Sequence, residues 1–198
     1  MKLALVRGDT DGVRRHLPRV ELAGTSTTWR KAVHAARARG LSAVGDIVAA
    51  NEELTAFLAA GPELHSHYLV NPFNTDLILA TLDLGVGDRE TLADAVLDEQ
   101  WHWNVNGSVD RWRGKAYLLR GDLDAAERWL EVGAASCRER GIELELGRCL
   151  QDLASVAEAR GQHETALERL EQAGEIYSRL GAGGYLSEVI AKKEILKA

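Results

Sequence analysis

The sequence predicts an all-α protein built from a row of helical hairpins, and three observations lead to this fold class. The chain has only three prolines in 198 residues, and apolar residues recur at intervals of three and four along most of it, as they do on one face of a helix. No stretch shows the sustained apolar/polar alternation of a half-buried strand. Finally, the segments GDLDAAERWL, from Gly121, and GQHETALERL, from Gly161, share Gly, Ala and Leu at their first, sixth and tenth places.

The composition is that of a folded protein in water. Hydrophobic residues make up 45% of the chain and charged residues 27%, which is ordinary for a globular domain. A net charge of -6 argues against a general positive field, so we expect no direct binding to nucleic acid. The N-terminus lacks the apolar core of a signal peptide, and no apolar run approaches the roughly 20 residues that cross a bilayer. We therefore expect a cytoplasmic protein with no membrane partner.

Residues 1–107 are expected to form degenerate hairpins. Three stretches there resemble the two quoted above and begin at Gly8, Gly40 and Gly87. Their sixth places hold Val13, Gly45 and Leu92 in place of alanine. Prolines 62 and 72 each suit the first turn of a helix, so we expect an extra loop or short helix near residues 61–72. Because only seven residues precede Gly8, the chain is expected to begin inside a repeat, as a fragment or a truncated gene product would.

Residues 108–180 are expected to form the clearest hairpins. The first helices carry apolar stripes at Val109, Trp112, Ala116 and Leu119, and at Leu146, Leu150, Leu153 and Ala157. Gly121 and Gly161 fall where one helix ends and the next begins, because glycine tolerates the left-handed backbone of a helix end. The small side chains of Ala126 and Ala166 allow two helices to cross closely, and Leu130 and Leu170 fill the core beyond them. A last helix at 184–197 is expected to cap the row, since a stacked array needs a terminal element over its last apolar face.

This skeleton resembles the tetratricopeptide repeat (TPR), a helix-turn-helix unit with Gly near its middle and Ala at the crossing of its helices. The resemblance implies a right-handed α-solenoid of about five TPR-like hairpins plus the capping helix, forming one domain over residues 1–198. The spacing near 40 residues also resembles, loosely, the helical arrays at the C-terminal end of large bacterial LuxR-type and cyclase-associated signalling regulators. The implied function is a non-catalytic scaffold that binds a protein or peptide, or the regulatory or sensory module of a larger bacterial signalling or transcriptional regulator.

The TPR resemblance also implies that the first helix of each hairpin lines a concave groove. The residues expected on its exposed side are Arg30, His34, Arg37, Arg111, Lys115, Arg148, Gln151, Ser155 and Glu158. Arginine and lysine dominate this set, which favours an acidic or carboxylate-terminated peptide as the partner. The alternative is a solvated face with pairs inside one helix, such as Arg148 with Asp152. The sequence leaves both interpretations open, and the carboxylate-clamp pattern of peptide-binding TPR proteins is not reproduced.

Motifs for catalysis are missing from the sequence. It contains no Gly-x-x-x-x-Gly-Lys-Ser/Thr loop, no Gly-x-Ser-x-Gly elbow and no His-Glu-x-x-His, so we expect no enzyme and no cofactor. His65 and His67 are too few for a zinc site, and we expect no metal. Cys137 and Cys149 are expected to be buried free thiols.

One aromatic segment supports an alternative function. A ligand wall could be formed by Trp101, His102, Trp103, Asn104 and Asn106, because aromatic rings with amides beside them can line a pocket. The chain would then be a small-molecule sensor or an unusual enzyme with His102 as the acid or base. The competing interpretation is that these aromatics seal a gap between helices. A third hypothesis is a homodimer formed through the incomplete first hairpin.

Overall fold

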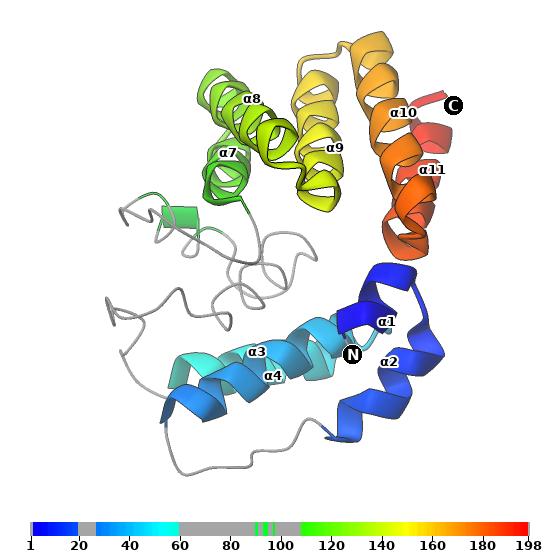
Figure 1. The fold of residues 1–198 in the computed structure, drawn as a ribbon. Helices are drawn as coiled ribbons and strands as arrows, with labels where there is room; N and C mark the ends of the chain where they lie inside the picture. The colour runs from blue at the N-terminus through cyan, green and yellow to red at the C-terminus, as the bar shows by residue number, and fades with distance from the viewer. Residues whose placement is uncertain are drawn as a thin grey trace. The chain divides into compact units, whose positions relative to one another are not determined.

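The computed structural model describes residues 2–19, 27–59, 90, 93–94, 97 and 108–197. The chain divides into two compact units, one formed mainly by residues 9–92 and the other mainly by residues 107–198. Within the described ranges every regular element is a helix, as Figure 1 shows, which confirms the all-α class for these residues. The extra helix expected near 61–72 and the turn expected at Gly87 lie outside the described residues.

The N-terminal helices are short at first and then form one well-packed hairpin. Helices α1 (Lys2–Arg7) and α2 (Thr10–His16) are followed by a 3-10 turn over Leu17–Arg19 and by α3 (Thr27–Ala43) and α4 (Ile47–Ala59). Gly8 joins the first two with φ at 70°, as the sequence indicated. The helices α3 and α4 pack against each other through a core of Ala35, Ala38, Ala50, Leu54 and Phe57.

The turn between α3 and α4 lies at Gly45, and the prediction of a turn at Gly40 is wrong. Gly40 is buried inside α3, which continues to Ala43. The helix ends there because the Gly45 amide donates to Ser42 and the Asp46 amide donates to Leu41, each at 3.0 Å. This closure requires a left-handed residue, and Gly45 supplies it with φ at 87°.

Over residues 108–197, the C-terminal unit is a row of five helices that lie in chain order (Figure 1). They are α7 (Val109–Leu119), α8 (Leu123–Arg140), α9 (Glu143–Ala159), α10 (His163–Leu180) and α11 (Gly183–Lys197). Each helix packs against the next. Left-handed glycines occupy all four turns, at Gly121, Gly141, Gly161 and Gly181. The turns expected at Gly121 and Gly161 are therefore confirmed, and this packing is consistent with TPR-like hairpins.

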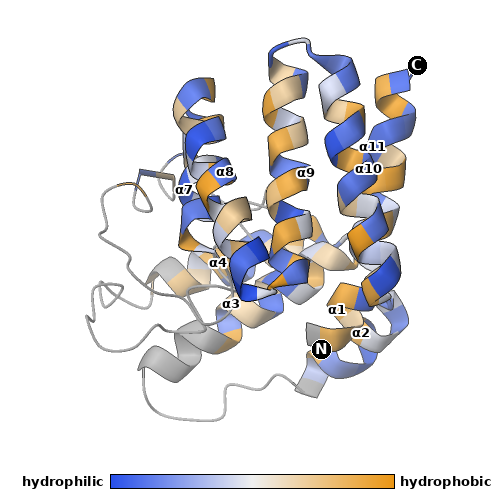
Figure 2. Ribbon diagram, turned by 45° about the horizontal axis from the view of Figure 1, so that its top comes forward, coloured by the Kyte–Doolittle hydropathy of each residue, from blue (hydrophilic) through white to orange (hydrophobic). Residues whose placement is uncertain are grey.

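The core of this unit contains the alanines and leucines that the repeat indicated. Ala126, Leu130, Ala166 and Leu170 are all fully buried, and Figure 2 shows hydrophobic residues of α9 and α10 where these helices adjoin. The close approach also depends on two glycines of the first helices. A Cβ at Gly114 would lie 2.5 Å from Leu130 Cγ, and one at Gly147 would lie 2.6 Å from the Tyr177 ring. The small residues therefore come from both helices of each pair.

Helix α11 occupies the range expected for the last helix, 184–197, with one residue added at its start. It buries Val189 but leaves Ile190 and Ile195 at 53% and 72% exposure. Its role as a cap, the handedness of the solenoid, the number of units and the single domain all remain predictions.

Candidate functional site

Polar side chains of α7, α9 and α11 meet on one side of the C-terminal unit, and we call this side the polar face. Its members are Arg111, Lys115, Glu145, Arg148, Gln151, Asp152, Ser155, Glu158, Glu188 and Lys192. Contacts from α7 to α9 and from α9 to α11 recur at a separation of 37 residues. They join Lys115 Nζ to Asp152 Oδ1 at 3.0 Å, Gln151 Nε2 to Glu188 Oε2 at 3.4 Å, and Lys192 Nζ to Ser155 Oγ at 2.8 Å.

Asp152 is the charged centre of the polar face. Arg111 Nε lies 2.7 Å from Asp152 Oδ2, and these two residues are only 3% and 4% exposed. Burial alone would raise the pKa of Asp152, but the charges of Arg111 and Lys115 and the hydrogen bond from Lys115 outweigh it, so the pKa lies below its usual 3.8. Asp152 is therefore ionised at neutral pH, and its two cations hold α7 against α9.

A second buried pair belongs to α9 alone. Arg148 Nη1 donates to Glu145 Oε1 at 2.7 Å, and its guanidinium lies 5.5 Å from the centre of the Tyr185 ring on α11. The Tyr185 ring stacks on Tyr177 with centroids 5.3 Å apart. The backbone amide of Ser108, which precedes α7, donates to the same Glu145 at 3.3 Å. Arg148 and Glu145 thus connect α9 to α11 and to the start of α7.

Tyr177 supports the polar face from α10. Its hydroxyl donates to Gln151 Oε1 at 3.0 Å, which leaves the amide nitrogen of Gln151 directed to Glu188. Burial raises the pKa of the Tyr177 hydroxyl, so it remains a neutral donor. The orientation of the Gln151 amide is therefore set by contacts on both sides.

The charges of the polar face are balanced. Its basic members are Arg111, Lys115, Arg148 and Lys192, and its acidic members are Glu145, Asp152, Glu158 and Glu188. The arginines and lysines that the sequence singled out are joined by four carboxylates. The sequence placed Asp152 beside Arg148 alone and Glu158 in the same set, but it did not place Glu145 or Glu188 there. The signal for these carboxylates was present, since Asp152 and Glu188 follow Lys115 and Gln151 by the same 37 residues.

The structure brings six of the predicted groove residues of α7 and α9, Glu158 among them, onto the polar face. Arg111 and Arg148 are buried, whereas Lys115, Gln151, Ser155 and Glu158 are partly exposed. Glu158 Oε2 forms an ion pair with Lys192 Nζ of α11 at 2.9 Å. The partly exposed members are the ones that solvent or a ligand can reach.

The groove residues predicted in α3 belong to the other unit. His34 Nδ1 lies 2.6 Å from Glu53 Oε2, and Arg37 Nε donates to Glu53 Oε1 at 2.5 Å. Both contacts join α3 to α4 within the hairpin. Arg30 lies in α3, but its side chain is outside the described residues.

Other residues with a predicted chemical role are placed as follows. The segment from Trp101 to Asn106 and the histidines at 65 and 67 lie outside the described residues. Cys137 and Cys149 are buried free thiols between α8 and α9, as expected. In the parts of the chain that the structure describes, no three His, Cys, Asp or Glu residues gather where they could hold a metal ion. None of the described helices is long and apolar enough to span a membrane.

A family model of the tetratricopeptide repeat matches residues 107–131 and 147–172. The two matches cover α7 with the first half of α8, and most of α9 with the first half of α10. No curated protein and no solved structure matches the chain. The segment 107–172 therefore carries tetratricopeptide repeats.

Proposed function

We propose that the tetratricopeptide repeats of residues 107–172, together with α11, form a non-catalytic scaffold that binds an extended segment of a partner protein on the polar face. Repeats of this kind present long surfaces and suggest protein interaction. The observation that supports the proposal most is the series of contacts 37 residues apart, which joins α7 to α9 and α9 to α11 in the same way.

The partner is held by side chains that both donate and accept hydrogen bonds. Gln151 and Ser155 lie next to each other on α9 and are partly exposed, and an extended peptide offers backbone groups to such side chains. Arg111 and Arg148 already contact Asp152 and Glu145. An acidic peptide, as the sequence favoured, would compete with these carboxylates for the same guanidinium groups.

Binding can be tested with peptides selected on the whole chain from a random library displayed on phage. A selected peptide is labelled, and its dissociation constant is measured by fluorescence anisotropy. The variant Gln151→Arg should weaken binding at least about tenfold, because it removes a two-sided hydrogen-bonding group and fills the surface beside it. The matched control is Gln172→Arg, which makes the same change at an exposed position of α10 and should leave affinity unchanged.

The salt dependence of the affinity distinguishes an acidic peptide from a peptide held by hydrogen bonds. Affinity for an acidic peptide held by charge falls steeply as salt is added, whereas affinity carried by hydrogen bonds changes little. A library that yields no binding peptide, or peptides that lose affinity with Gln172→Arg and not with Gln151→Arg, would contradict the proposed surface.

The more specific expectations from the sequence remain predictions. They are the role as a module of a larger bacterial regulator, the cytoplasmic location, the homodimer, and the alternative sensor or enzyme that uses Trp101 to Asn106.

A further inference from the structure

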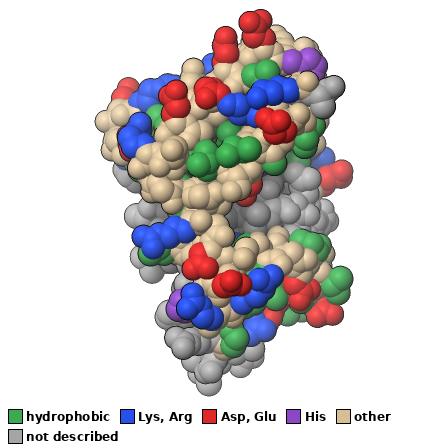
Figure 3. Space-filling model, turned by 90° about the vertical axis from the view of Figure 1, so that its right-hand side faces the viewer, with side chains coloured by type: hydrophobic (Ala, Val, Ile, Leu, Met, Phe, Trp, Pro, Cys, Tyr) green, Lys and Arg blue, Asp and Glu red, His purple; other side chains and the backbone are tan. Residues whose placement is uncertain are grey.

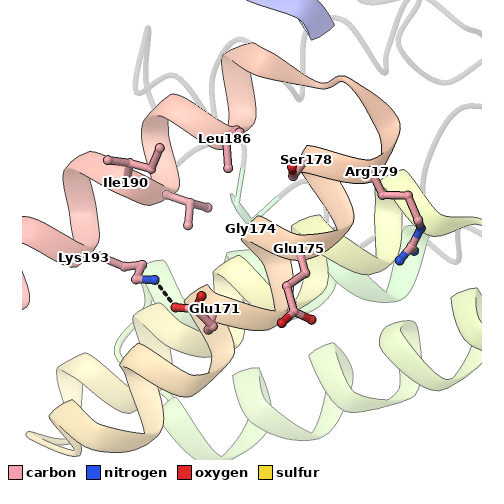
Figure 4. Close-up of a pocket in the computed structure, with 9 residues that line it drawn as sticks. Glu171, Gly174, Glu175, Ser178, Arg179, Leu186, Ile190 and Lys193 are labelled. Carbon is pink, nitrogen blue, oxygen red and sulfur yellow. Dashed lines mark hydrogen bonds and ion pairs between the residues drawn. The ribbon is translucent and has the colours of Figure 1, made fainter.

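An open groove lies between α10 and α11, away from the polar face. It has a volume of about 490 Å³. In Figure 4, Leu186 and Ile190 project from α11 beside Gly174 of α10, and Lys193 reaches across to Glu171. Figure 3 views the molecule from the right of Figure 1 and shows hydrophobic side chains exposed among acidic and basic ones.

The equivalent position one repeat earlier is filled by a helix. The turns at Gly141 and Gly181 are 40 residues apart, as are those at Gly121 and Gly161, so α8 and α9 correspond to α10 and α11. Helix α10 packs on α9 and reaches α8 through Arg169, whose Nη2 donates to Glu131 Oε1 at 2.7 Å.

The two grooves share their chemistry but differ in exposure. Shifting by 40 residues pairs Glu131 with Glu171, Ala134 with Gly174, Leu146 with Leu186, and Leu150 with Ile190. Leu150 shares a core cluster with residues of α10 and is 2% exposed. Ile190 is 53% exposed. Among the described residues, no helix covers Ile190 as α10 covers Leu150.

The acidic residue of the groove makes a substitute contact. Glu131 accepts from Arg169 of the covering helix, whereas Glu171 accepts from Lys193 of α11. Lys193 stands at the position equivalent to Leu153, which is buried. One repeat earlier, Arg169 of the covering helix supplies the positive charge beside Glu131. In the α10–α11 groove, Lys193 of α11 supplies the positive charge beside Glu171.

We propose that the α10–α11 groove binds an amphipathic helix of a partner protein that carries a basic residue toward Glu171 and a leucine toward Ile190. The mode is that of a helix laid into a groove, with the partner occupying the position that α10 occupies on α8 and α9. This surface is distinct from the polar face, so the proposal does not depend on the function proposed above.

The same 40-residue correspondence also predicts which side chain of the partner helix must be small. Ser187 stands where α9 has Gly147, whose missing Cβ makes room for Tyr177. A helix bound on α11 therefore carries a small residue at the position of Tyr177. Glu194 and Lys197 stand where α9 has the buried Ala154 and Ala157, so close contact is confined to the first half of α11.

The probe for this proposal is a peptide copy of residues 161–180 that carries Tyr177→Ala. A hydrocarbon staple between positions 164 and 168, both exposed in α10, keeps it helical, and its binding to the whole chain is measured by fluorescence anisotropy. We expect saturable binding that Ile190→Glu weakens at least about tenfold. The matched control is Val132→Glu on α8, because Val132 is 51% exposed and lies outside the groove.

An exchange of charges between peptide and protein tests whether the bound peptide places Arg169 beside Glu171. Arg169→Glu in the peptide should weaken binding, and Glu171→Arg in the protein should restore the affinity of that altered peptide. Absence of saturable binding, equal losses with Val132→Glu and Ile190→Glu, or failure of the exchange to restore affinity overturns the proposal.

Light scattering of the chain alone separates this occupant from a second copy. A doubled mass that returns to the monomer value in Ile190→Glu would mean that another copy covers the groove, and would overturn the proposal. Peptides selected for the polar face serve as a further control, because Ile190→Glu should not change their affinity. Failure here and failure of the proposed function are thus distinguishable.

Discussion

The sharpest test of the packing concerns Asp152, which contacts Arg111 at 2.7 Å with side-chain exposures of 5% and 3%. Asp152→Asn keeps the shape of the side chain but removes its charge, so the buried Arg111 guanidinium loses the carboxylate that contacts it at 2.7 Å. Breaking a buried pair in this way costs about 3 kcal/mol or more, equivalent to about a hundredfold in the unfolding equilibrium. Chemical denaturation followed by circular dichroism measures this loss in the free energy of unfolding.

The control is the pair Arg179 and Glu143, which has the same 2.7 Å separation but side-chain exposures of 58% and 44%. Glu143→Gln makes the same carboxylate-to-amide change and should cost less than about 1 kcal/mol. The double variant Arg111→Met with Asp152→Asn should recover most of the loss, because no buried charge is then left alone. Equal costs for Asp152→Asn and Glu143→Gln would mean that burial does not determine how much each ion pair stabilises the protein.

Three further predictions concern stability. Gly147→Ala should lower it by about 1–3 kcal/mol because its Cβ would lie 2.6 Å from Tyr177, whereas Gly174→Ala meets its nearest neighbour at 3.5 Å and should raise the melting temperature through better helix propensity. Gly45→Ala should cost about 1 kcal/mol because φ is 87° there; an unchanged melting temperature would count against this turn. Because the folded pKa of Asp152 lies below 3.8, its contribution is full above that pH and is lost as the pH falls through the folded value, so stability should fall more steeply with acid in the wild type than in Asp152→Asn.

The hairpins could be predicted where small and large residues recur together. In residues 121–130 and 161–170, glycine sets the turn, alanine allows the helices to cross closely and leucine fills the core. In the structure the glycines occupy turns and the alanines and leucines are buried, as expected. The first half was harder because it offers two glycines within six residues, at 40 and 45. Gly45 matches the Gly, Ala and Leu pattern better, because Ala50 and Leu54 follow it at the sixth and tenth places. The hydrogen bonds that end α3 place the turn at Gly45.

The candidate site could be predicted by position but not by charge. Helical spacing selects Arg111, Lys115 and Gln151 as neighbours on one side of their helices. It does not reveal that Asp152, one residue after Gln151, turns toward α7, because that depends on how two helices cross. Burial of Arg111 follows from the same crossing, so a residue expected to meet a ligand instead supports the surface.

We expect the polar face of α7, α9 and α11 to receive a segment of the partner protein. Amide chemical shifts of the isotope-labelled chain, recorded by NMR while a library-selected peptide is added, test it most directly. If the peptide binds the polar face, the largest changes occur at the amides of Gln151, Ser155 and Lys192. Changes concentrated on α8 and on the exposed side of α10, with these three amides unaffected, would contradict it.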